Sequence, residues 1–89
     1  MTAIIIPAHN EAAVIGQTLQ GLLRQVGEGD EVIVVCNGCS DDTAAVARRF
    51  EPRVTVLETE VPSKTNALNL GDRRARLFPR VYQDADVVL

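Results

Sequence analysis

The sequence predicts an α/β fold, a three-layer α/β/α domain with a mostly parallel sheet. Short apolar runs alternate with amphipathic stretches in the order βαβαβαβ, the links between them are short, and polar residues follow the apolar runs. Continuous apolar strands that alternate with helices are typical of a parallel sheet covered on both faces. In such sheets ligands bind outside the carboxyl ends of the strands.

The expected strands are short and rich in valine and isoleucine, as strands buried on both faces usually are. They span residues 3–7, 31–36, 53–58 and 80–83. Pro7 stops the first run, and Pro79 interrupts the chain just before the last one.

The first expected helix covers residues 9–27, and its apolar residues form one stripe at helical spacing. These residues are Ile15, Leu19, Leu22, Leu23 and Val26. Asn10 is the expected N-cap, with Glu11 in the first turn, and Gly27 marks the end of the helix.

Two further helices complete the pattern. One covers residues 40–50, after an Asn-Gly turn, and Ser40 or Asp41 is its expected cap. The other covers residues 64–78, after a loop that contains Pro62. No repeat or linker interrupts the order, so residues 1–89 are expected to form a single domain.

Length and charge limit the classes of protein. Eighty-nine residues suffice for one small domain, and a net charge of −3 argues against a nucleic-acid binder. The first residues lack a basic leader, and no apolar stretch approaches the length of a membrane span. A cytoplasmic location is therefore expected, with no membrane association visible in these residues.

An acid pair follows the last expected strand. Asp84 and Asp86 are one residue apart, and where the chain curls at a strand's end both carboxylates can reach one cation. Hard oxygen ligands suit Mg²⁺ or Mn²⁺. The alternative interpretation is a solvated acidic turn.

Two other charged residues lie next to expected strand ends. Glu11 follows the first strand and can accept hydrogen bonds from a ribose, although helix capping alone would explain it. Lys64 begins a helix, where a cation is disfavoured by the helix dipole unless an anion lies nearby; the alternative is a solvated lysine in a loop. His9 is expected to be a polar surface residue with no catalytic role.

Cys36 and Cys39 form a C-x-x-C pattern between a strand and a helix. Such a pattern is found in redox proteins, and a zinc site would need ligands from elsewhere. The alternative is that Cys36 is a buried strand residue and Cys39 a small turn residue. In a reducing compartment both thiols are expected to be free.

Four stretches in this order resemble the nucleotide-sugar-binding half of family-2 glycosyltransferases with the GT-A fold. They read "IIIPAHNEA", "EVIVVCNGCSDDT", "PSKTNALNLG" and "VYQDAD", and together they span nearly the whole chain. The resemblance implies the Rossmann-like half of a GT-A fold. It also implies a donor site in which groups around Pro7 and Ala8 line the base pocket and Glu11 contacts the nucleoside.

The remaining matches concern the base and the diphosphate. The family usually has an aspartate that bonds the base, in a D-D-G-S-x-D pattern, and Asn37 stands at that position. Asp41 matches the later aspartate of the pattern, with a role mainly in capping. The resemblance implies that Lys64 approaches the base or diphosphate, and that Asp84 and Asp86 hold Mg²⁺ or Mn²⁺ on the donor's diphosphate.

By this resemblance the chain is the donor-binding part of an enzyme that moves a sugar from a nucleotide-diphosphate sugar to an acceptor hydroxyl, with inversion. The acceptor region and catalytic base would follow the acid pair, so we expect a truncated, inactive piece without catalytic residues of its own. We also expect an exposed sheet edge that favours a homo-oligomer. A non-catalytic nucleotide-binding module and a C-x-x-C redox protein are the alternatives.

Overall fold

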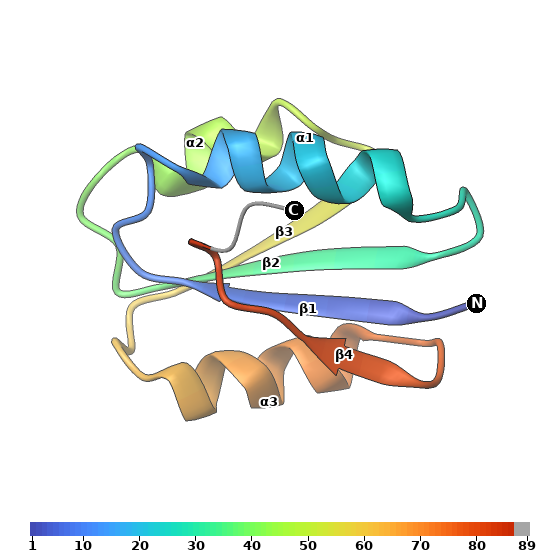
Figure 1. Cartoon of the computed structure of the whole chain (residues 1–89). Helices are drawn as coiled ribbons and strands as arrows, with labels where there is room; N and C mark the ends of the chain where they lie inside the picture. The colour runs from blue at the N-terminus through green and yellow to red at the C-terminus, as the bar shows by residue number, and fades with distance from the viewer. Residues whose placement is uncertain (87–89) are drawn as a thin grey trace.

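Four parallel strands form one sheet in the order β3-β2-β1-β4 in the computed structural model of the chain, which describes residues 1–86 (Figure 1). The strands are β1 (Ala3–Ala8), β2 (Glu31–Asn37), β3 (Val54–Thr59) and β4 (Arg80–Tyr82). The predicted parallel sheet is confirmed. Its two central strands, β1 and β2, are buried along almost their whole length, as their continuous apolar sequences indicate.

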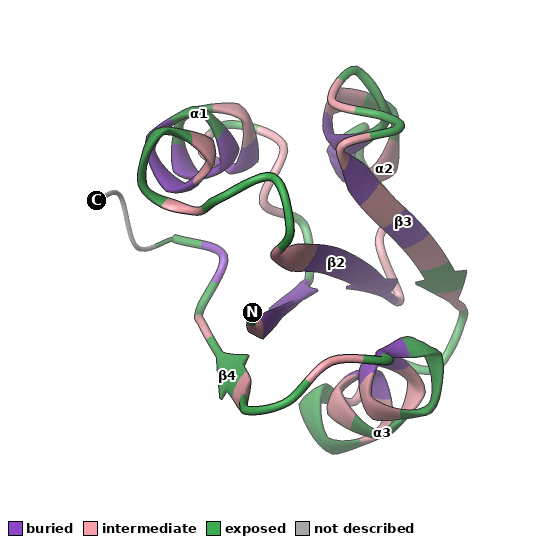
Figure 2. Cartoon of the chain, turned by 90° about the vertical axis from the view of Figure 1, so that its right-hand side faces the viewer, coloured by how far each residue is buried: buried purple, intermediate pink, exposed green. Residues whose placement is uncertain are grey.

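Helices cover both faces of the sheet, so the three-layer α/β/α prediction is also confirmed. Figure 2 shows α1 (Ile15–Gln25) and α2 (Thr43–Arg48) on one face and α3 (Lys64–Arg74) on the other. Alternate residues of each central strand supply the two cores. The core under α1 and α2 contains Ile4, Ile6, Val32 and Val34, and the core under α3 contains Ala3, Ile5, Ile33 and Val35.

The start of α1 differs from the prediction. Asn10 does not cap this helix; it has a positive φ of 52°, and its side-chain oxygen accepts hydrogen bonds from the backbone of Ser40 (2.8 Å) and Asp41 (3.3 Å). A turn closed by the Glu11 carbonyl and the Val14 N–H leads into the helix instead. The prediction was wrong because the side chain of Asn10 accepts hydrogen bonds from the loop after β2 and not from the start of α1.

The other two helices are shorter than predicted. Helix α2 begins at Thr43, whose N–H donates to the Asp41 carboxylate at 3.0 Å, so Asp41 satisfies an N-terminal donor from just outside the helix. Ser63 caps α3, where its hydroxyl accepts from Asn66 N–H. This helix ends at Arg74, since Ala75 has extended backbone.

Gly38 forms the tight turn at the carboxyl end of β2. Its φ is +58°, and a Cβ atom there would lie 2.7 Å from Cβ of Pro62. Glycine alone accepts both the left-handed backbone and this close approach. The turn therefore brings the loop before α3 directly against the end of β2.

Strand β4 forms one edge of the sheet within the described residues. Phe78, Val81 and Tyr82 are exposed there. The expected homo-oligomer stays a prediction.

Among residues 1–86, no helix combines the length and the apolar character that crossing a bilayer requires.

Candidate functional site

A cavity of about 290 Å³ lies at the carboxyl ends of the strands. Its lining residues are Pro7, His9, Glu11, Asn37, Lys64, Asp84, Ala85 and Asp86. The list includes six of the seven residues predicted to bind the donor or its metal. Segments from four different parts of the chain meet here, because parallel strands end at one edge of the sheet.

Ala8 is the predicted site residue that does not line this cavity. It is fully buried, and its carbonyl oxygen accepts hydrogen bonds from Asn37 Nδ2 at 3.0 Å and from Cys39 Sγ at 3.5 Å. The Asn37 side chain is therefore fixed against β1 as well as lining the cavity. An amide donates here where a carboxylate could only accept.

His9 lines the cavity, although it was predicted to be a polar surface residue with no catalytic role. Its Nδ1 lies 2.6 Å from the backbone oxygen of Asn37, which fixes the imidazole ring at the cavity wall. A lone loop histidine carries no signal in the sequence that would separate this position from ordinary surface. Its inclusion adds a side chain that can both donate and accept hydrogen bonds.

Hydrogen bonds join the loops after β1 and β2 into one rim. The Thr43 hydroxyl accepts from Glu11 N–H at 2.9 Å and donates to the Asp41 carboxylate, which also accepts from Ala12 N–H. The hydroxyl of Thr43, and then backbone N–H groups, lower the pKa of Asp41. Asp41 is thus ionised at neutral pH and serves to fix the position of Glu11.

Lys64 and Asp84 contact each other within the cavity. The ammonium Nζ lies 2.7 Å from Asp84 Oδ1, and the pair spans 20 positions in sequence. Lys64 therefore has an anion nearby, and that anion is part of the chain itself; the contact of Lys64 with a base or diphosphate stays a prediction.

The acid pair is held in place by the residue between its members. Ala85 is buried in the core under α1, and its carbonyl oxygen accepts a 2.6 Å hydrogen bond from the fully buried Thr18 hydroxyl. Figure 1 shows this segment (red) passing from β4 toward α1. Because Ala85 faces the core, Asp84 and Asp86 are left at the cavity. Sequence reasoning missed Thr18, whose position in an amphipathic helix gives no hint of a partner 67 residues away.

Replacing Thr18 with valine tests this anchor. Valine has nearly the same shape but leaves the Ala85 carbonyl without its donor, so the free energy of unfolding should fall by about 1–2 kcal/mol. Urea denaturation measures this change. Thr18→Ser, which keeps the hydroxyl, should lose less; equal losses in the two variants would show that the hydrogen bond contributes nothing.

The donor set of the cavity suits a hard divalent cation. Asp84 and Asp86 offer carboxylate oxygens, which Mg²⁺ and Mn²⁺ prefer. Within residues 1–86 no cluster of three or more histidine, cysteine or acidic side chains is arranged to hold a metal. Two carboxylates alone fit Mg²⁺, which commonly takes its remaining ligands from water and from substrate phosphates.

The charges of the cavity set a condition on its ligand. Glu11, Asp84 and Asp86 contribute three carboxylates, against the single ammonium of Lys64. An anionic ligand entering alone would meet net negative charge. A divalent cation would reverse this repulsion, so the cavity suits a diphosphate only together with a metal.

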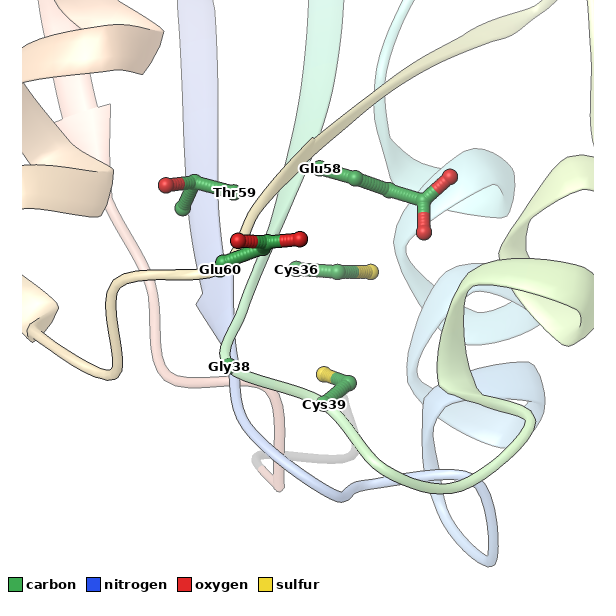
Figure 3. Close-up of a pocket in the computed structure, with 6 residues that line it drawn as sticks. All are labelled: Cys36, Gly38, Cys39, Glu58, Thr59 and Glu60. Carbon is green, nitrogen blue, oxygen red and sulfur yellow. The ribbon is translucent and has the colours of Figure 1, made fainter.

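A second hollow, of about 340 Å³, lies between β3 and the loop after β2 (Figure 3). Cys36, Cys39, Glu58 and Glu60 face it, and its carboxylates make it unsuitable for an anion. Burial, and then the neighbouring Cys39, raise the pKa of the Cys36 thiol to about 12. A thiol that stays protonated at neutral pH is a poor nucleophile, so this geometry does not favour the C-x-x-C redox alternative.

Comparison with known proteins finds similarity to glycosyltransferases. A probable glycosyltransferase of Bacillus subtilis, YdaM, is 35% identical over 78 residues, which are 78% of this chain and 19% of the relative. The 4,4'-diaponeurosporenoate glycosyltransferase of Staphylococcus aureus is 35% identical over 88 residues, 94% of this chain and 23% of the relative. The chain thus spans about a fifth of the length of these curated relatives.

Solved structures share the fold. The mannosyltransferase PcManGT from Pyrobaculum calidifontis, solved in complex with GDP-Man and Mn²⁺, superposes with a TM-score of 0.88 at 32% identity, over 98% of this chain and 28% of that one. Staphylococcus aureus TarS, at 20% identity, gives a TM-score of 0.84 over 96% of this chain and 16% of that one and supports the fold alone. The model of glycosyl transferase family 2 matches residues 3–89. With that match spanning nearly every residue, and with the parallel sheet that superposes on PcManGT, the chain belongs to glycosyl transferase family 2.

Proposed function

We propose that the chain is the donor-binding part of a glycosyltransferase that moves a sugar from a nucleotide-diphosphate sugar to an acceptor hydroxyl. The observation that carries the proposal is the convergence of Lys64, Asp84, Asp86 and Asn37 on one cavity at the carboxyl ends of the strands. The GDP-Man and Mn²⁺ named for the similar mannosyltransferase support a nucleotide sugar with a divalent metal.

In this proposal each residue has a physical task. Asn37 and the backbone around Pro7 meet the base, and Glu11 accepts hydrogen bonds from the ribose. Asp84 and Asp86 would hold Mg²⁺ or Mn²⁺, which neutralises the negative charge that develops on the departing diphosphate. Lys64 adds a second positive charge beside the diphosphate.

The acceptor site and the catalytic base lie outside these residues in the proposal, and the displacement proceeds with inversion. The 89-residue chain by itself should therefore bind donor without transferring sugar. A cytoplasmic location stays a prediction.

Calorimetric titration with GDP and UDP, with and without Mn²⁺, tests the proposal. We expect binding that requires Mn²⁺, because the cavity alone is negatively charged, and at least a tenfold loss of affinity in the double variant Asp84→Asn, Asp86→Asn. Tenfold corresponds to about 1.4 kcal/mol.

A double variant with two exposed acids changed, Glu28→Gln and Asp42→Asn, removes the same charge outside the cavity and should bind as the parent does. Nucleotide binding of equal strength without Mn²⁺ would contradict the metal assignment. A complete lack of binding to either nucleotide in the presence of Mn²⁺ would contradict the donor site.

A further inference from the structure

Lys64 occupies a position that the helix does not favour. It is the first residue of α3, and the first turn contains no acidic residue to offset its charge. The positive end of the helix dipole disfavours a cation there by a few tenths of a kcal/mol. Its only ion pair among the described residues is with Asp84, which follows β4 and lines the same cavity.

The Lys64–Asp84 ion pair is weak enough to exchange partners. The Nζ–Oδ1 distance is 2.7 Å, yet the two side chains remain 64% and 58% exposed. Ion pairs so exposed contribute about 0–1 kcal/mol. A divalent cation approaching Asp84, or a diphosphate approaching Lys64, can therefore displace the other member of the pair.

The residue type also matters. Lys64 is the only lysine in the sequence, and the other eight basic residues are arginines. A lysine ammonium is a compact charge on a flexible stem, whereas an arginine guanidinium grips a carboxylate with two parallel hydrogen bonds. A side-chain charge that must move from one oxygen partner to another is therefore better supplied by lysine than by arginine.

We propose that Lys64 pairs with Asp84 in place of the metal and releases Asp84 when a diphosphate binds, a role that rests on the proposed function of the cavity. In the free protein Lys64 holds Asp84 and so lowers the affinity of the acid pair for a cation that arrives without nucleotide. When the diphosphate arrives, Lys64 turns to it, and Asp84 becomes available to the cation.

This exchange makes metal and nucleotide binding mutually cooperative. Whatever releases Lys64 from Asp84 favours the cation, and by linkage the cation favours the nucleotide by the same factor. The exchange lowers the occupancy of the cavity by a metal while no donor is present. It acts on binding alone and requires no covalent step.

Calorimetric or paramagnetic titration of the 89-residue chain with Mn²⁺ alone separates this proposal from the general function of the site. Lys64→Gln should bind Mn²⁺ alone about threefold more tightly than the parent, within the range available to an exposed ion pair. Lys64→Arg should bind Mn²⁺ alone more weakly than the parent. With saturating GDP or UDP the difference between Lys64→Gln and the parent should disappear, because Lys64 then contacts the diphosphate and no longer competes for Asp84.

Arg73→Gln is the matched control, since it removes one exposed positive charge from the same helix about 13 Å further along its axis. It should leave Mn²⁺ affinity unchanged. Weaker or unchanged Mn²⁺ binding in Lys64→Gln would overturn the exchange. Because the titration with Mn²⁺ alone involves no nucleotide, a failure of the donor proposal would leave this arm decisive.

Discussion

Replacing Gly71 with alanine should destabilise the domain by about 2 kcal/mol, although alanine is the better helix former. A Cβ atom at position 71 would clash with Cγ2 of Ile5 and lie 3.4 Å from its Cδ1. Ile5 is a fully buried residue of β1 in the core under α3, and the clashing atom is the methyl group on its branched Cβ, close to the backbone. Overpacking of this kind costs about 1–3 kcal/mol or more, which exceeds the gain of about 1 kcal/mol in helix propensity.

Thermal denaturation gives a direct measurement of the Gly71→Ala effect. For a domain of this size a loss of about 2 kcal/mol lowers the melting temperature by roughly 10 °C. Gly16→Ala is the matched control in another helix, since a Cβ there would lie 3.5 Å from Val46, an ordinary contact. That variant should be as stable as the parent or more so. Equal behaviour of the two variants would refute the close approach of α3 to β1.

The close approach of Gly71 to Ile5 also affects the cavity. The carbonyl oxygen of Ile5 accepts a hydrogen bond from Gln83 N–H at 3.0 Å, directly before Asp84. Helix α3, which Gly71 allows to approach β1, also carries Lys64. A displaced α3 would therefore alter both partners of the Lys64–Asp84 pair, so we expect Gly71→Ala to weaken donor binding as well as stability.

The layers of the fold could be predicted because the signals for them are local. Continuous runs such as residues 31–36 allow little besides a buried strand, and the stripe from Ile15 to Leu22 fixes the inner face of α1. The start of α1 could not be predicted, since it depends on Asn10 bonding to a loop 30 residues later. Capping preferences describe one segment at a time and do not include such competition.

The candidate site also has a part that could be predicted from the sequence and a part that could not. Its residues lie after strand ends, where the topology of a parallel sheet brings them together whatever their detailed contacts. The interactions that shape it are long-range: Thr18 with Ala85, Lys64 with Asp84, and His9 with Asn37. None has a spacing that a sequence pattern could reveal. The sequence thus predicts the members of the cavity better than the contacts that position them.

Replacing Asn37 with aspartate should destabilise this chain by about 3 kcal/mol at pH 8. Aspartate is the residue that family 2 usually has at the position that Asn37 matches. Asn37 is almost fully buried, and its Nδ2 donates to the Ala8 carbonyl at 3.0 Å. A carboxylate would set two acceptors against each other and would bury a charge in a cavity that already holds three acids. Lost donors and buried charges each cost about 1–3 kcal/mol or more.

The loss of stability in Asn37→Asp should grow as the pH rises. Burial and neighbouring acids would raise the folded-state pKa of the introduced carboxyl above its unfolded value of about 3.9. Below about pH 4 the carboxyl is protonated in both states and can donate to the Ala8 carbonyl, so the penalty is small. It grows as the pH rises toward the raised folded-state pKa and is constant above it.

Urea denaturation of the parent and of Asn37→Asp at pH 4 and pH 8 checks this sign. Asn69→Asp makes the same chemical change on the exposed surface of α3 and should alter the free energy of unfolding by no more than about 0.5 kcal/mol at either pH. A penalty of equal size at both pH values would mean that ionisation of the introduced carboxyl is not its cause. No penalty at either pH would leave base contact, rather than the demands of folding, to explain why this chain has asparagine there.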